Sequence, residues 1–171
     1  MRVLGIDPGL ARTGWGVIDK DERNGRLRVS ESGCLVTEAE TGLTERLNQL
    51  SEELDGLLRR VRPDEVAIEE LYFSKASRTA ASVGHARGVI LLTLSKSSLQ
   101  VYEYNPRRIK IALTGYGSAD KSQMQRMTQT LLNLPTLPKP DDVADALAVA
   151  LCHIHTAPLA RSTARSAGGR P

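Results

Sequence analysis

The chain has 171 residues, of which 40% are hydrophobic and 25% are charged, and its formal net charge is +3. These values fit one globular domain with a sizeable core, and they exclude a membrane-spanning helix because no apolar run approaches the ~20 residues that a span needs. The two cysteines and three histidines form neither a disulfide framework nor a zinc-binding spacing, which predicts reduced thiols in a cytoplasmic chain.

The first part of the chain predicts three strands joined by short turns. Residues 2–7 form an apolar run that ends in Asp7, residues 13–18 resume after a Pro-Gly turn, and residues 26–37 alternate between apolar and polar side chains. Such a meander is antiparallel. Because a strand begins at once, we expect no signal peptide.

The later segments alternate between helices and strands. We expect helices over residues 44–61, 77–96, 107–113, 118–132 and 141–155, with Ser118 as an N-cap, and strands over residues 65–69 and 99–104. Together these elements predict a mixed five-stranded α/β sheet flanked by helices. The ends of the first and fourth strands would be neighbours if the later strands add beside the first.

Two segments bear on domain organisation and assembly. Residues 1–156 read as one domain, whereas residues 157–171 are small and basic with nothing to bury, so a disordered tail is expected.

Small residues recur at helical spacing in Ser77, Ala80, Ala81, Gly84 and Gly88. This stripe would let another backbone approach closely, either the sheet, which is the favoured partner, or a second subunit.

Four carboxylates stand where an α/β fold can bring them together. Asp7 and Glu69 end apolar strands, and Asp142 and Asp145 share one turn at the start of the last helix. Clustered carboxylates repel one another unless a cation joins them, and hard oxygen donors suit Mg²⁺ or Mn²⁺. The set therefore predicts a metal site for phosphate chemistry, although any one of these acids alone is better explained by a structural role.

The residues leave some choices open. Glu69 and Glu70 are adjacent and point to opposite faces of a strand, so only one of them can join Asp7. Asp141 lies about a third of a turn from Asp142 and also suits a helix cap. An apolar strand ending in Asp and Gly also opens actin-like and sugar-kinase ATPases, but these need two such domains and 171 residues cannot supply both.

Positive charge is concentrated in the middle of the chain. Residues 71–140 carry ten basic and two acidic side chains, whereas residues 1–70 carry ten basic and fifteen acidic ones. This distribution is compatible with a polyanion across an acidic metal pocket, and a solvated face of ordinary lysines and arginines explains it equally well. Tyr72 and Phe73 follow the fourth strand, where they would stack on unpaired bases if exposed or join the core if buried.

Short motifs are spread in order along most of the chain. They are GIDPG at residues 5–9, TGWGV at 13–17, AIEE at 67–70, ARG at 86–88, GSADKS at 117–122 and DVADALA at 142–148. Together they resemble the bacterial RuvC Holliday junction resolvases, over residues 1 to about 155. The resemblance implies an RNase H-like fold, a homodimer, and an endodeoxyribonuclease that nicks four-way DNA junctions in recombination and repair.

Carried over position by position, the resemblance gives the catalytic and metal-binding roles to four acids and chooses Glu69 over Glu70. These acids are Asp7, Glu69, Asp142 and Asp145. It implies two Mg²⁺ or Mn²⁺ ions per active site, and it points to the RuvA/RuvB branch-migration complex as a partner. The expected DNA contacts are Tyr72, Phe73, Lys75, Arg78, Lys110 and Lys121.

Two other functions are compatible with the same pattern. The first is an RNase H-like nuclease that acts on another nucleic acid, such as an RNA–DNA hybrid. The second is a non-catalytic junction-binding module, which is disfavoured because such a module would gain by discarding negative charge near DNA.

Overall fold

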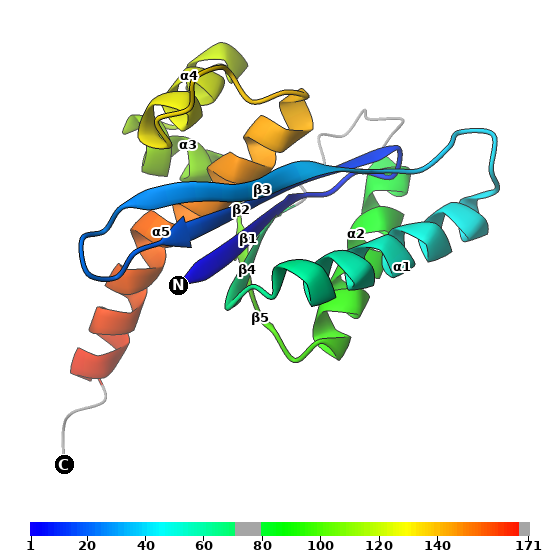
Figure 1. Ribbon diagram of the computed structural model, residues 1–171, viewed down its shortest axis with the longest axis horizontal. Coiled ribbons are helices and arrows are strands. Elements are labelled where there is room, and N and C mark those ends of the chain that lie inside the picture. Colours follow the sequence, from blue (N-terminus) through cyan, green and yellow to red (C-terminus); the bar gives the residue numbers. More distant parts are fainter. Residues whose placement is uncertain (71–79, 168–171) are drawn as a thin grey trace.

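The computed structural model describes residues 1–70 and 80–167, with side chains as far as residue 157. The strands are β1 (Arg2–Asp7), β2 (Arg12–Lys20), β3 (Leu27–Val36), β4 (Glu65–Glu69) and β5 (Gln100–Tyr104). The helices are α1 (Leu43–Val61), α2 (Ala80–Lys96), α3 (Pro106–Thr114), α4 (Lys121–Leu131) and α5 (Asp141–Ala167). The expected mixed sheet flanked by helices is confirmed (Figure 1).

The strand order of the sheet is β3-β2-β1-β4-β5. The first three strands pair antiparallel as a meander, and β4 and β5 run parallel to β1. Ile6 of β1 stands opposite Ile68 of β4. The next residue on each strand is an acid, so Asp7 and Glu69 lie at the same edge of the sheet, as expected.

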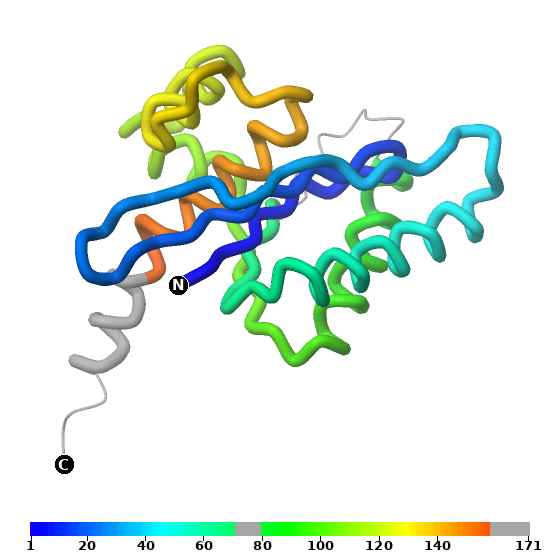
Figure 2. The backbone as a smooth tube through the Cα atoms, in the orientation of Figure 1, coloured from blue at the N-terminus to red at the C-terminus, as the bar shows by residue number. Residues whose placement is uncertain are grey.

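Helices cover both faces of the sheet, in the arrangement that Figures 1 and 2 show. Leu4 and Ile6 of β1 pack with α1 and α2, whereas Val3 packs with α3, α4 and α5. Successive strand residues point to opposite faces, so a strand covered on both faces must be apolar throughout. This explains the unbroken apolar run before Asp7.

Glycines let α5 lie directly on β1 and β2. A Cβ added to Gly5 would stand 2.9 Å from Ala150 Cβ, and one added to Gly14 would stand 2.9 Å from Asp142 Cβ. Both distances are too short for non-bonded carbon atoms, so only glycine fits at either position. Gly14 thereby brings the first turn of α5 against β2.

The ends of the last two helices differ from the sequence expectation. The N-cap of α4 is Asp120 and not Ser118, because the Asp120 carboxylate accepts from Gln123 N at 2.9 Å while the Gln123 side chain accepts from Asp120 N. Helix α5 continues to Ala167 instead of ending near residue 155. The extension contains several alanines, the strongest helix formers, but also Pro158, which costs a backbone hydrogen bond in a helix interior. The division into a domain at 1–156 and a tail at 157–171 stays a prediction.

Two glycines of the small-residue stripe do not pack on the sheet. Among the described residues, nothing lies within 4 Å of a Cβ added to Gly84 or Gly88. The helix turns Ala86 and Ile90 inward instead, because these larger side chains fill the layer beside α1. The preference for the sheet as the partner of this stripe was therefore wrong for these glycines; Ser77 lies outside the described residues.

Both cysteines are free thiols, with Cys152 buried and Cys34 half-buried. Burial raises the pKa of the Cys152 thiol to about 11, which makes it a poor nucleophile. Among the helices of the described part of the chain, none is both long and apolar enough to cross a membrane.

Candidate active site

The sheet edge where β1 and β4 end holds the candidate site. Asp7 and Glu69 are the last residues of these strands, and α5 begins beside them with Asp142 and Asp145 in its first turns. A pocket of about 190 Å³ opens here. Its walls include Glu69 and Asp145 together with Lys110 and Lys121.

Strand register settles which glutamate faces this pocket. Ala67 packs in the layer that contains α5, whereas Ile68 packs in the layer that contains α1 and α2. Glu69 shares the face of Ala67, because side chains two apart on a strand point the same way. Glu70 lies beyond the strand, where its N–H donates to the Tyr104 carbonyl at 2.8 Å.

Burial and mutual repulsion raise the pKa values of the two acids that end β1 and β4. Burial first, and then the charges of Glu69, Asp145 and Asp142, raise the pKa of Asp7 to about 8. Burial and the charge of Asp145 raise the pKa of Glu69 to about 7, against an opposing hydrogen bond with Asp7 and the charge of Lys110. The three elements therefore bring together more negative charge than the surrounding protein neutralises.

Two cationic side chains border this cluster. Lys121 Nζ lies 2.9 Å from Asp141 Oδ2 and 3.7 Å from Asp145 Oδ2. Arg12 Nη1 lies 3.4 Å from Asp142 Oδ2 on the β2 side. Asp141 thus pairs with Lys121 at the edge of the site, and its charge also contributes to the raised pKa of Asp145.

The donors present suit a hard divalent cation. Every candidate ligand is a carboxylate oxygen, the donor type that Mg²⁺ and Mn²⁺ prefer. Within the residues that the structure describes, no group of three or more His, Cys, Asp or Glu side chains forms a ready-made metal cage. The acids are close enough to shift one another's pKa, and a cation among them would relieve that repulsion.

A family model described as crossover junction endodeoxyribonuclease RuvC matches residues 3–153. The chain belongs to the RuvC family. A RuvC of Roseiflexus sp. (strain RS-1) is 52% identical over 160 residues, which cover 94% of each chain. That of Chloroflexus aggregans is 52% identical over 158 residues, which cover 92% of this chain and 95% of the relative.

Solved structures of RuvC proteins share the architecture. Thermus thermophilus RuvC has a TM-score of 0.85 and 34% identity, covering 94% of this chain and 97% of its own. T. thermophilus RuvC in complex with a Holliday junction substrate has a TM-score of 0.82 and 31% identity, covering 93% and 96%. The RNase H-like fold expected from the sequence is confirmed.

Of the predicted DNA-contacting residues, the structure brings Lys110 and Lys121 to the pocket beside the acids. The other four (Tyr72, Phe73, Lys75 and Arg78) lie outside the described residues. Sequence reasoning missed Arg12, which precedes the TGWGV motif and meets Asp142 only through folding. It also left the role of Asp141 open, and the only signal for its pairing was a lysine at the start of the preceding helix.

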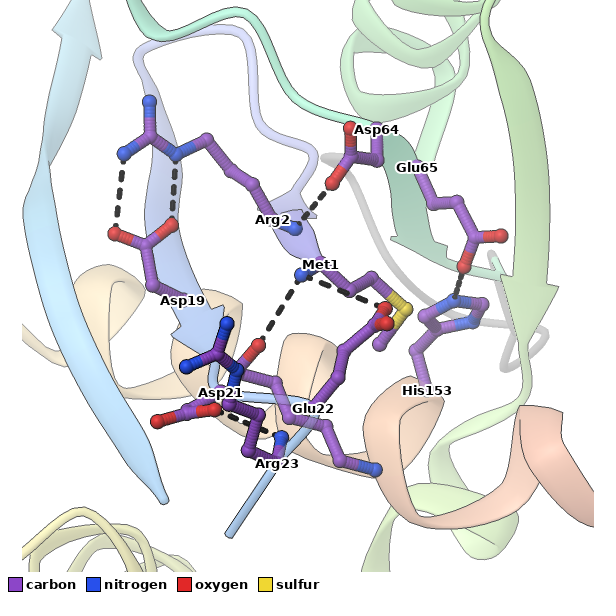
Figure 3. A network of polar contacts seen from close by, with 10 residues as sticks. Met1, Arg2, Asp19, Asp21, Glu22, Arg23, Asp64, Glu65 and His153 are labelled. Atoms are coloured by element: carbon purple, nitrogen blue, oxygen red, sulfur yellow. Dashed lines mark hydrogen bonds and ion pairs between the residues drawn. The ribbon is translucent and has the colours of Figure 1, made fainter. Parts of the chain in front are cut away.

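A larger hollow of about 1020 Å³ lies at the opposite end of the sheet. It is bordered by Met1, Arg2, Asp19 and Asp64, whose hydrogen bonds and ion pairs tie the start of β1 to the end of β2 and the start of β4 (Figure 3). Its walls carry both signs of charge and none of the candidate catalytic residues. The smaller pocket, which includes Glu69 and Asp145, is therefore the candidate site.

Metal-free protein should lose stability as the pH rises from about 4 to about 8, the window between the ordinary and the raised pKa of Asp7. In this window the folded state binds the proton more tightly than the unfolded chain does, so the free energy of unfolding falls with increasing pH. We expect the free energy of unfolding of Asp7→Asn at pH 8 to exceed that of the wild type by on the order of 1–2 kcal/mol. This corresponds to a Tm higher by roughly 2–8 °C. Melting curves in chelator at several pH values measure this. A difference between variant and wild type that is constant with pH would contradict it.

Glu69 and Glu70 form a matched pair for testing the assigned face. We expect Glu69→Gln to lower cleavage of a four-way junction by at least about 100-fold, because it removes a charged oxygen donor from the site. Glu70→Gln makes the same chemical change one residue away and should alter the rate by less than about threefold. Single-turnover assays compare the two, and equal losses would show that the strand register has been misread.

Proposed function

We propose that this RuvC family member is a structure-selective endodeoxyribonuclease that resolves Holliday junctions by paired symmetric nicks during recombination and repair. It works as a homodimer and requires Mg²⁺ or Mn²⁺. One observation carries the proposal: acids that end two adjacent parallel strands face a pair of acids on α5. Support also comes from a relative of the same fold that was solved in complex with a Holliday junction substrate.

Asp7, Glu69, Asp142 and Asp145 are the proposed metal ligands. Carboxylate oxygens are the donors that divalent ions such as Mg²⁺ prefer, and the repulsion among these acids favours cation binding over retention of protons. When bound, such ions supply an activated water and neutralise charge that develops on the scissile phosphate. The protein contributes the rigid placement, since each acid is at a strand end or in the first turns of a packed helix.

Basic side chains around the pocket are proposed to orient the DNA backbone. Lys121 is held by Asp141, which fixes its ammonium group at the rim of the site. Arg12 approaches from the β2 side and Lys110 from α3. These positive charges would bind phosphates on either side of the scissile one and hold it over the acids. Tyr72 and Phe73 remain proposed stacking residues at the crossover.

The α2 surface supports the proposed dimer. Among the described residues, and apart from α2 itself, no atom lies within 4 Å of a Cβ added to Gly84 or Gly88, and Leu92 on the same helix is 56% exposed. An apolar, small-residue helix face lets a second subunit approach closely. A junction has equivalent strands related by two-fold symmetry, so two sites in a symmetric dimer would allow paired nicks. The RuvA/RuvB complex is the proposed partner for branch migration.

Cleavage assays on three substrates test the proposal. The protein is incubated with a synthetic four-way junction, a linear duplex or an RNA–DNA hybrid, with Mg²⁺ or with chelator. We expect paired nicks in the junction alone and no cleavage in chelator. Cutting of the hybrid without the junction would point to a different nuclease, and junction binding without cutting would point to a binding module. A monomer in sedimentation at assay concentrations would contradict the dimer.

A further inference from the structure

A buried histidine joins α5 to the two parallel strands at one side of the sheet. The side chain of His153 is 0% exposed. Its Nδ1 lies 2.7 Å from the Tyr104 hydroxyl on β5, and its Nε2 lies 2.6 Å from Glu65 Oε2 on β4. Figure 3 shows the contact between Glu65 and His153. We call these three residues the histidine bridge.

With Glu65 ionised, the hydrogen bonds of the bridge have one consistent set of proton positions. Burial lowers the pKa of His153 to about 4, so the ring is neutral and has one donor and one acceptor nitrogen. A Glu65 carboxylate can only accept, so Nε2–H donates to Glu65 and Nδ1 accepts from the Tyr104 hydroxyl. Both ring nitrogens are thereby satisfied in the protein interior, where an unpaired one would cost about 1–3 kcal/mol.

The position of the bridge relates it to the catalytic acids. Tyr104 is the strand neighbour of Glu69, since these residues are paired in the β4–β5 register. His153 is on the helix that carries Asp142 and Asp145, two turns beyond Asp145 and about 12 Å along the axis. The bridge therefore connects the strand beside one acid to the helix that presents two others.

Between the bridge and the acids, α5 touches the sheet through small apolar surfaces. Gly5 faces Ala146 and Ala150, and Gly16 faces the Leu147 side chain. Such contacts favour close approach but have little directionality, so they fix how near the helix lies to the sheet more than how it is rotated about its axis. Hydrogen bonds are strongly directional and resist such rotation. At its start, α5 has ion pairs to the largely exposed Lys121 and Arg12, whereas the histidine bridge is a directional contact made by a fully buried side chain.

We propose that the histidine bridge is a positioning device that sets the rotation and axial placement of α5, and thereby the alignment of Asp142 and Asp145 with Asp7 and Glu69. This role rests on the proposed function, because it assumes that the four acids bind metal together. A misplacement of about 1 Å at such a site costs on the order of 100-fold in rate. His153 itself is a positioning residue, since it contacts none of the proposed ligands.

Tyr104→Phe tests the bridge by removing one oxygen atom. The control is Ser51→Ala, which removes the 2.9 Å hydrogen bond between Ser51 of α1 and Thr93 of α2 on the other face of the sheet. We expect both variants to lower Tm by a few degrees. Only Tyr104→Phe should weaken Mn²⁺ binding, by roughly three- to tenfold in calorimetry, and lower kcat for junction cleavage by roughly tenfold or more. Junction affinity without metal should be unchanged.

Hydrogen exchange on metal-free protein provides a readout that does not depend on metal binding. Tyr104→Phe should speed amide exchange at residues 142–150, whereas Ser51→Ala should speed it only in α1 and α2. Equal effects of the two variants on α5 exchange would overturn the positioning role. Failure of wild-type protein to bind Mn²⁺ would instead overturn the proposed function.

A second pair of variants tests the histidine directly. His153→Gln should retain more Mn²⁺ affinity than His153→Leu, because the amide keeps a hydrogen bond to Glu65. Equal affinities of the two variants would overturn the positioning role.

Discussion

Replacing Asp7 by asparagine is expected to lower junction cleavage by at least about 10³-fold, which corresponds to roughly 4 kcal/mol of activation free energy. The amide keeps the shape of the side chain but loses the negative charge at the centre of the acid cluster. Asp7 is the member whose pKa responds to all three of the other acids. Single-turnover cleavage in Mg²⁺ measures the loss.

Junction binding distinguishes this loss from a folding defect. Without metal Asp7 largely holds a proton at neutral pH, so the neutral amide should leave the affinity for the four-way junction unchanged, as measured in chelator by a gel-shift assay. The variant should also melt no lower than the wild type, because it removes a repulsion. If binding disappears together with cleavage, Asp7 has a role other than the one assigned here.

Gly5→Ala should impair cleavage about 100-fold although it adds no functional group. The new Cβ would stand 2.9 Å from Ala150 Cβ and closer still to the Ala146 carbonyl oxygen, which is helix backbone and cannot rotate away. The helix must therefore move off β1 and carry Asp142 and Asp145 with it. We expect a stability cost of about 1–3 kcal/mol, as for other overpacked cores. Cleavage rates and thermal melts measure the two effects.

Gly56→Ala is the matched control, because Gly56 lies at an exposed position of α1 and, among the described residues, no atom lies within 4 Å of a Cβ added there. The same substitution should be neutral there or stabilise by up to about 1 kcal/mol, since alanine restricts the unfolded chain. Cleavage should be unchanged. A Gly5→Ala variant with wild-type activity would mean that the contact of α5 with β1 does not place the acids.

The local sequence pattern was sufficient to predict the helices and strands, but not several of the residues at which they begin and end. Strand β4 spans residues 65–69 as expected, because its apolar run is bounded by charged residues. The cap of α4 was misassigned to Ser118, since serine and aspartate are similar caps and only the reciprocal bonds of Asp120 and Gln123 distinguish them. The partner of the α2 stripe was misjudged because spacing does not reveal which face of a helix meets the sheet.

By itself, the sequence determined that acids end two apolar strands and begin an apolar helix, and it determined the order of helices and strands, because these features depend on neighbours within a few residues. Only the tertiary structure decided that Glu69 and not Glu70 faces the pocket by geometry, that Arg12 meets Asp142, and that His153 bridges two strands. Each of these facts joins residues far apart along the chain, and such contacts arise from the register and packing of whole elements, which no local pattern encodes.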